Sequence, residues 1–130
     1  TLTFAAPGSS SFSYITQEGH YSCVNGWVNI WGHLVYTATL GTASGALIWN
    51  NPPYSLASTN DNSAMVVQFG GTWSALSSYY VMIPSSTSAF KFVQFNGSGG
   101  ASSVTATNVT SGSSEVIVFA ASYEVNGDAC

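Results

Sequence analysis

The chain has 130 residues, a length typical of one domain with its own hydrophobic core. Apolar residues make up 45% and aromatic residues 14%, so the composition excludes an intrinsically disordered chain. Charged residues make up only 5%, with Lys91 as the one cation and a net charge of -4. This balance argues against partners that carry many phosphates, namely nucleic acid and anionic membrane surfaces.

Short runs rich in β-branched and aromatic residues alternate with clusters of Gly, Ser, Asn and Pro, which predicts an all-β protein. About ten short strands separated by turns are typical of an antiparallel β-sandwich, here a single domain over 1–130. In chain order, we expect strands over 2–5, 12–16, 19–24, 27–39, 45–49, 64–69, 79–83, 89–95, 103–107 and 115–125.

The first half of the chain contains one strong turn signal and one of the two cysteines. Asn25-Gly26 lies between two strand patterns and predicts a two-residue hairpin, because both residues tolerate positive φ. Cys23 and Cys130 permit one disulfide, but Cys130 ends the chain. We therefore favour Cys23 as a small buried apolar residue, and the pairing stays open.

Residues 27–37 alternate with a period of two and so define two faces of a strand. One face is an ordinary core face, made of Val28, Ile30, Gly32, Leu34 and Tyr36. The opposite face should meet water, yet it contains two tryptophans. Three explanations stand: a subunit interface, cover by another segment of the same subunit, or an exposed platform for sugar rings. The interface explanation, which we favour, involves Trp27, Trp31, His33 and Val35.

The later strand patterns differ in how regularly they alternate. The stretch FKFVQF, residues 90–95, fails to alternate, which predicts a strand covered on both sides or a bulge. The last strand alternates cleanly. Its inward positions are Ile117, Phe119, Ala121, Tyr123 and Val125.

Catalytic and metal-binding patterns are missing from the sequence. His20 and His33 fall on neighbouring expected strands, and we expect no acid near them. No motif of a metalloprotease, a hydrolase or a phosphate-binding loop occurs, and Asp61 lies in a stretch typical of a polar loop. We predict no catalytic residue, no metal site and no cofactor.

A second set of aromatic residues lies at strand ends or in expected loops, where binding residues are common. These are candidate contacts for a glycan, although residues of this kind belong to the core more often than they contact a ligand. The set is Trp49, Tyr54, Trp73 and Tyr79.

The run over residues 16–54 resembles a domain found in tail fibres, spikes and head-decoration proteins of tailed bacteriophages. Gly19 and Tyr21 match the opening of the family pattern, and the strand over 27–37 matches its centre. A loop over 41–45 and then Pro53-Tyr54 match its end. The stretches 70–73, 90–99 and 113–125 resemble the later strands. Two departures are the order Asn25-Gly26 in the hairpin and an asparagine where the family has leucine before proline.

This resemblance implies a jelly-roll-like β-sandwich that assembles as a homotrimer on a virus particle and has no catalytic residue. Its partners would be other copies of the chain, other virion proteins and, in some members, a host-surface glycan. Because the chain begins at Thr1, we expect either a processed protein or the C-terminal part of a longer fibre or decoration protein.

The alternative function is a carbohydrate-binding module of a secreted protein. Such a module is typically monomeric and presents a row of exposed aromatic side chains. The oligomeric state and the exposure of the aromatic residues therefore discriminate between the two hypotheses.

Overall fold

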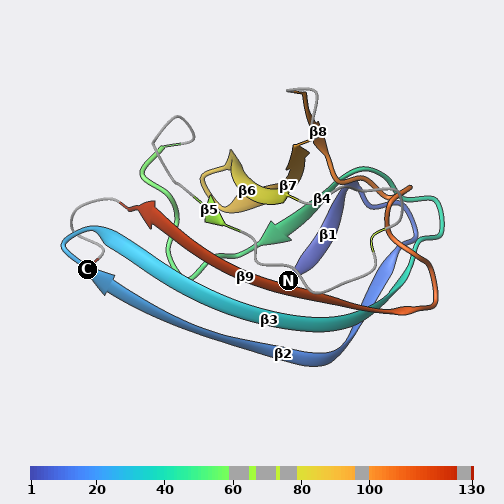
Figure 1. The fold of residues 1–130 in the computed structure, drawn as a ribbon, viewed down its shortest axis with the longest axis horizontal. Helices are drawn as coiled ribbons and strands as arrows, with labels where there is room; N and C mark the ends of the chain where they lie inside the picture. The colour runs from blue at the N-terminus through green and yellow to red at the C-terminus, as the bar shows by residue number, and fades with distance from the viewer. Residues whose placement is uncertain (59–64, 67–72, 74–78, 96–99, 126–129) are drawn as a thin grey trace.

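The computed structural model describes residues 1–58, 65–66, 73, 79–95, 100–125 and 130 (Figure 1). Over these residues the protein consists of strands and connecting segments, and none of them forms a helix that could cross a membrane. The strands are β1 (Leu2–Ala6), β2 (Ser11–Val24), β3 (Trp27–Thr39), β4 (Ser44–Asn50), β5 (Met65–Val66), β6 (Tyr79–Ser86), β7 (Ala89–Phe95), β8 (Ala101–Ser103) and β9 (Ser114–Glu124).

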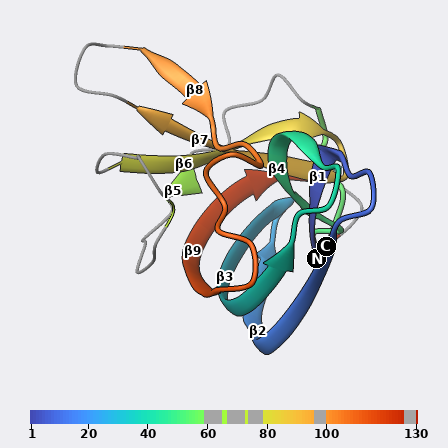
Figure 2. The same ribbon diagram turned by 90° about the vertical axis from the view of Figure 1, so that its right-hand side faces the viewer.

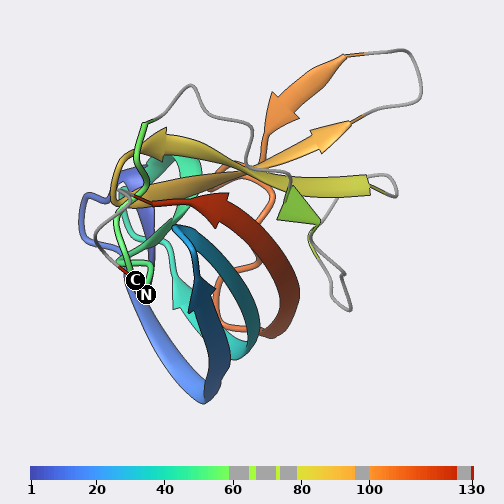
Figure 3. The same cartoon turned by 90° about the vertical axis from the view of Figure 1, so that its left-hand side faces the viewer.

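The strands form two antiparallel sheets, which confirms the predicted all-β class and agrees with a β-sandwich. The first sheet has the order β1-β4-β7-β6, with β8 also paired to β7. The second has the order β2-β3-β9-β5. Figures 2 and 3 show β2, β3 and β9 as a strongly curved layer, with β1, β4, β6 and β7 in the layer opposite. Edge strand β2 of the second sheet lies beside β1 of the first.

The β2–β3 hairpin turns where the sequence predicts. Asn25 and Gly26 have φ values of 50° and 78°, and Val24 pairs directly with Trp27. However, β2 is one strand of 14 residues where we expected two. Its register against β3 shifts between Tyr14 and Thr16, so one extra residue is accommodated as a bulge. The two predicted runs join because the residues between them, Gln17 and Glu18, pair directly with Leu34 and His33 of β3.

The core lies between the two sheets and follows the predicted alternation. Val28, Leu34 and Tyr36 of β3 are buried, and so are the inward residues of the last strand. Rings from opposite sheets meet, as Trp49 does with Phe119 at 5.0 Å between centroids. In β7, the neighbours Phe92 and Val93 point to opposite faces and both are buried, so this strand is covered on both sides as expected.

Two predicted strands differ from the observed ones. The strand expected over 103–107 is replaced by β8, which ends at Ser103. The Asn108 Oδ1 accepts a hydrogen bond from the Thr105 backbone N at 2.9 Å, and this local turn competes with a continued strand. Of the strand expected over 64–69, the structure describes β5 at 65–66, and residues 64 and 67–69 lie outside the described residues.

Cys23 and Cys130 form a disulfide, with their Cα atoms 5.8 Å apart. The interpretation of Cys23 as an unpaired apolar residue is therefore wrong. The reason lies in the order of the strands. Because β9 pairs with β3 and Glu124 lies opposite Trp27, the chain leaves the sheet beside the hairpin, within a few residues of Cys23. The backbone N–H of Val125 also donates to the Gly26 carbonyl at 2.8 Å.

Candidate functional site

The outward face of the curved sheet exposes both of the tryptophans that the alternation places there. Trp27 is 43% exposed and Trp31 40% exposed, so the subunit itself leaves a large part of both indoles in contact with solvent. The explanation that another segment of the same subunit covers the two tryptophans is therefore not supported. Val24, which pairs with Trp27 across the hairpin, is also exposed.

Apolar side chains of β9 extend this surface. Trp31 lies opposite Ala120, His33 opposite Val118, and Val35 opposite Val116 in the β3–β9 register. Val116 and Val118 are half-buried and Ala120 is exposed. We call this surface the outer face, defined by Trp27, Trp31, His33, Val35, Val116, Val118 and Ala120. It brings the four predicted interface residues together on one strand.

Both histidines flank Trp31. The His20 ring stacks on the Trp31 indole with centroids 5.7 Å apart, and the His33 ring lies at 6.4 Å on the other side. The Oε2 of Glu18 lies 3.9 Å from Nδ1 of His33, so the expectation of no acid near the histidines is wrong. Antiparallel pairing places Glu18 directly opposite His33, and only the register reveals this.

Within the part of the chain that the structure describes, the two histidines and Glu18 do not make up a group that could hold a metal ion. The described residues contain no group of three or more His, Cys, Asp and Glu side chains that could hold a metal ion. Glu18 is 64% exposed, and an exposed ion pair of this kind contributes about 0 to 1 kcal/mol to stability. The neighbouring rings of His20, Trp31 and His33 therefore contribute mainly a flat, polarisable surface to the outer face.

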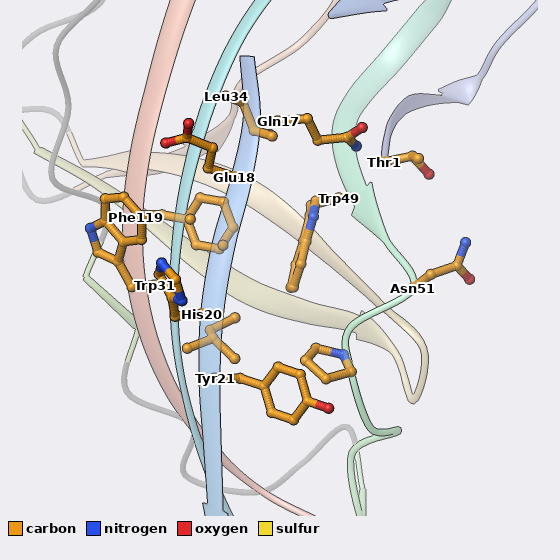
Figure 4. Close-up of a pocket in the computed structure, with 14 residues that line it drawn as sticks. Thr1, Gln17, Glu18, His20, Tyr21, Trp31, Leu34, Trp49, Asn51 and Phe119 are labelled. Carbon is orange, nitrogen blue, oxygen red and sulfur yellow. The ribbon is translucent and has the colours of Figure 1, made fainter.

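A pocket of about 270 Å³ opens on the other side of β2, facing the first sheet (Figure 4). Gly19 and Gly32 lie opposite each other in the β2–β3 pair and line it without side chains. Trp49 of β4 forms the wall across from them, and Tyr21 forms one end. The sheets are thus separated here by a gap that no side chain of β2 fills.

The structure brings together some of the predicted glycan contacts. Trp49 lines the pocket, and Tyr54 lies next to it, its ring meeting that of Tyr21 edge to face at 5.9 Å. The side chain of Tyr79 lies outside the described part of the chain. Tyr21 was missed as a ligand candidate, although it is 58% exposed. Its position two residues after Gly19 on the same strand face was the available signal.

Trp73, also a candidate glycan contact, is a core residue, which is the alternative that the sequence favours for it. It is 5% exposed and packs against the rings of Tyr80 and Phe92. Its Nε1–H donates to the Tyr36 hydroxyl at 2.9 Å. A tryptophan whose ring and polar atom are both used inside the core has no surface left for a ligand.

The Tyr36 hydroxyl continues this chain of hydrogen bonds to a buried acid. It donates to Oε2 of Glu115 at 2.8 Å, and Oε1 of Glu115 accepts from the Thr110 backbone N at 2.9 Å. Burial is the main cause that raises the pKa of Tyr36 above its usual value. Because every member is enclosed and hydrogen-bonded, we interpret this network as structural.

Tyr123 is a second buried tyrosine, and it makes stability depend on alkaline pH. Burial raises the pKa of Tyr123 to about 12, whereas an unfolded tyrosine titrates near 10. The unfolded chain therefore releases this proton first, and stability present below pH 10 is lost as the pH rises toward 12. We expect the free energy of unfolding, measured by urea titration, to fall by about 2 to 3 kcal/mol from this group alone. Tyr123→Phe should flatten that fall, and an unchanged slope would contradict the assignment.

Comparisons of the chain with protein-family models, curated proteins and solved structures find no match. A function has to be inferred from the outer face and the pocket themselves.

Proposed function

We propose that this domain is a non-enzymatic structural part of a virus particle, of the tailed-phage fibre, spike or head-decoration kind. In this proposal it is a jelly-roll-like sandwich that forms a homotrimer through the outer face. The observation that carries the proposal is the exposure of Trp27 and Trp31 on one regular sheet face. The resemblance of residues 16–54 to the phage domains supports the virion setting and the threefold state.

Burial of the outer face against a second copy would be favourable. Each indole exposes on the order of 100 Å², so covering it contributes about 2 kcal/mol at roughly 25 cal/mol per Å². Neighbouring Val116, Val118 and Ala120 add apolar area without adding a charge. Large buried aromatic side chains are also the residues that dominate stable interfaces.

Charge on the outer face does not oppose contact between identical copies. Among the acids that the structure describes, Glu18 lies opposite His33 on the edge strand β2, and Glu124 lies opposite Trp27 at the end of β9, so both flank the outer face. Few ions would have to be desolvated at the centre of such a contact. A second copy of this mainly apolar surface is therefore a suitable partner.

A position on the outside of a particle agrees with the disulfide. Structural disulfides persist in oxidising surroundings outside the cytosol. The net charge of -4 also favours protein and neutral partners over nucleic acid or an anionic membrane. Other virion proteins are the partners we propose besides the chain itself.

Trp31→Asp tests the interface. We expect the wild-type domain to have a mass near three times 13.5 kDa by light scattering on a sizing column. The variant should elute as a folded monomer, because it removes the indole and requires a carboxylate to lose its water at the centre of the contact. Thr87→Asp, on the exposed turn between β6 and β7 of the other sheet, is the matched charge control and should remain trimeric. A Trp31→Asp variant that keeps the trimer mass would refute the interface.

The pocket favours one other candidate function, a carbohydrate-binding module of a secreted protein. This candidate requires a stable monomer that binds sugar, so the same mass measurement separates it from the virion proposal.

A further inference from the structure

We propose that the pocket between β2 and β4 is a binding site for one neutral sugar ring, such as a pyranose of a surface glycan. This inference goes beyond the proposed homotrimer and does not require self-association, because the pocket lies between β2 and β4, although Trp31 of the outer face is also among its lining residues. The argument rests on the shape of the pocket, on the state of Trp49 and on the neutral chemistry of the lining.

The shape of the pocket results from paired glycines. A Cβ built on Gly19 would meet only backbone, the Trp31 carbonyl oxygen at 3.1 Å and the Gly32 Cα at 3.9 Å. No atom of the opposite sheet lies within 4 Å of it, so the space above Gly19 is open. The space above Gly32 is instead filled by the Phe119 ring, whose Cζ lies 2.3 Å from a built Cβ. The result is an open floor at Gly19 beside an aromatic wall.

Trp49 presents an unused hydrogen-bond donor at this pocket. It is only 9% exposed, and its indole is held by stacking on Phe90 at 5.7 Å and by contact with Phe119. Its Nε1–H forms no hydrogen bond with any residue that the structure describes. No fully buried side-chain nitrogen or oxygen in the described residues lacks a partner, so this Nε1 keeps some exposure to solvent, and Trp49 lines the pocket.

A rigid tryptophan with a free donor is informative because buried indole N–H groups normally find an acceptor. The Nε1 of Trp73 illustrates the normal case, since it donates to Tyr36. Figure 4 shows the indole of Trp49 standing across from β2, between Gln17 at one end and Tyr21 at the other. A ligand hydroxyl in the pocket would supply the acceptor.

The remaining lining is suited to a neutral ligand with both apolar and hydroxyl surface. Tyr21 and Pro53 are exposed and offer flat apolar area, and Gln17 and Asn51 are neutral amides. No Lys or Arg side chain lines the pocket, and the ionisable groups among its lining residues are the Thr1 amino group, Glu18 and His20. A sugar ring combines an apolar face of C–H groups with a rim of hydroxyls, which matches this lining.

The charged groups and the volume of the pocket narrow the class of ligand further. The Thr1 amino group donates to the Asn50 carbonyl at 3.0 Å, and Glu18 points its carboxylate toward His33. A volume of about 270 Å³ is just below the range of roughly 300 to 1,000 Å³ typical of sites for drug-sized ligands. The pocket therefore suits one ring of a sugar, and its open side leaves room for a chain to continue.

The loop beside the pocket is held in place before any ligand binds. Asn51 has a φ of 59°, a left-handed conformation that favours Asn or Gly. Its backbone N–H donates to the Ser88 carbonyl at 3.1 Å, and that of Asn50 donates to the Thr1 carbonyl at 2.7 Å. Strained conformations that the surroundings enforce are common at binding sites, where they lower the ordering cost of binding.

The test is an NMR titration that follows the indole N–H resonances. The probes are the methyl glycosides of glucose, galactose, mannose and N-acetylglucosamine, each with a matching oligosaccharide, and sialic acid as the anionic comparison. We expect at least one neutral glycoside to shift the Trp49 resonance selectively. Tighter binding of the oligosaccharide would identify a surface glycan as the source, and equal binding would identify a single sugar. Both outcomes support the site.

Variants then locate the binding. Tyr21→Ala, which removes an exposed ring, should weaken binding about tenfold or more, equal to about 1.4 kcal/mol. Asn51→Gly keeps the left-handed backbone and removes the amide, and Trp49→Phe removes the donor; both should weaken binding in folded protein. Val118→Asp, on the outer face and not among the residues that line the pocket, should bind sugar as the wild type does, so failure of the trimer proposal and failure of the sugar site can be told apart.

The site is refuted if no neutral sugar moves the Trp49 resonance at millimolar concentration. It is equally refuted if sialic acid binds more tightly than every neutral glycoside. Wild-type affinity in both Tyr21→Ala and Trp49→Phe, with native melting curves, would place binding elsewhere on the molecule.

Discussion

Cys23→Ser is expected to lower the free energy of unfolding by about 4 to 5 kcal/mol, the largest effect of any single change considered. The disulfide closes a loop with a sequence separation of 107 residues. In the chain-entropy description, a cross-link over a loop of this length restricts the unfolded chain strongly. The melting temperature should therefore fall by about 15 °C, since a domain of this size has an unfolding entropy near 2.1 cal/mol/K per residue.

The control for this prediction is Cys130→Ser, which breaks the same cross-link while leaving β2 unchanged. The two variants should lose the same stability, and reductant should destabilise the wild type but neither variant. The urea dependence of the unfolding free energy should also be steeper without the bond, because the unfolded chain then exposes more surface. A wild-type protein whose melting ignores reductant would contradict the role of the disulfide.

Tyr36→Phe is expected to lower the free energy of unfolding by about 3 to 5 kcal/mol, although it removes a single oxygen atom. The Tyr36 hydroxyl accepts from Nε1 of Trp73 and donates to the Glu115 carboxylate, and all three side chains are buried. Its removal leaves an indole N–H and one carboxylate oxygen without their partner in the core. A buried polar group that is left without a partner destabilises the folded protein by about 1 to 3 kcal/mol, and by more when it is charged. The melting temperature should fall by more than about 10 °C.

Tyr123→Phe is the matched comparison, because Tyr123 is also fully buried but donates only to a backbone carbonyl, that of Tyr54, at 3.1 Å. We expect Tyr123→Phe to lower the free energy of unfolding by about 1 kcal/mol. Combining Tyr36→Phe with Glu115→Leu should cost less than the sum of the single changes, because the carboxylate is removed together with its donor. Equal losses in the two tyrosine variants would show that the network contributes no special stability.

The parts of the fold that could be predicted are those that depend on neighbouring residues in the sequence. Asn25-Gly26 specifies its own turn, and the alternation in 27–37 separates core from surface without reference to any other strand. The continuity of β2 through Gln17 and Glu18 and its bulge after Tyr14 depend instead on pairing with β3. The disulfide depends on β9 being the other neighbour of β3, and strand order of this kind cannot be obtained from the spacing of two cysteines.

The contrast between features set by neighbouring residues and features set by strand pairing also explains which parts of the candidate site could be predicted. The outer face was predicted because its tryptophans lie on one alternating strand. The pocket was not predicted, because it requires Gly19 to lie opposite Gly32 and Trp49 to cross over them from the other sheet. The sequence leaves Trp73 between core and ligand contact for a related reason. Its partners Tyr36 and Phe92 are distant in sequence, so only the fold shows which role it has.

The disulfide also changes what a protease could do to this molecule. It joins residue 130 back to residue 23, so most of the polypeptide belongs to one covalent ring. A single cut anywhere within that ring opens it but releases no fragment, because both new ends remain attached through the sulfur bridge. A cut before Cys23, by contrast, severs β1 and most of β2 covalently from the rest. The nicked ring would migrate as two pieces on a gel only after reduction.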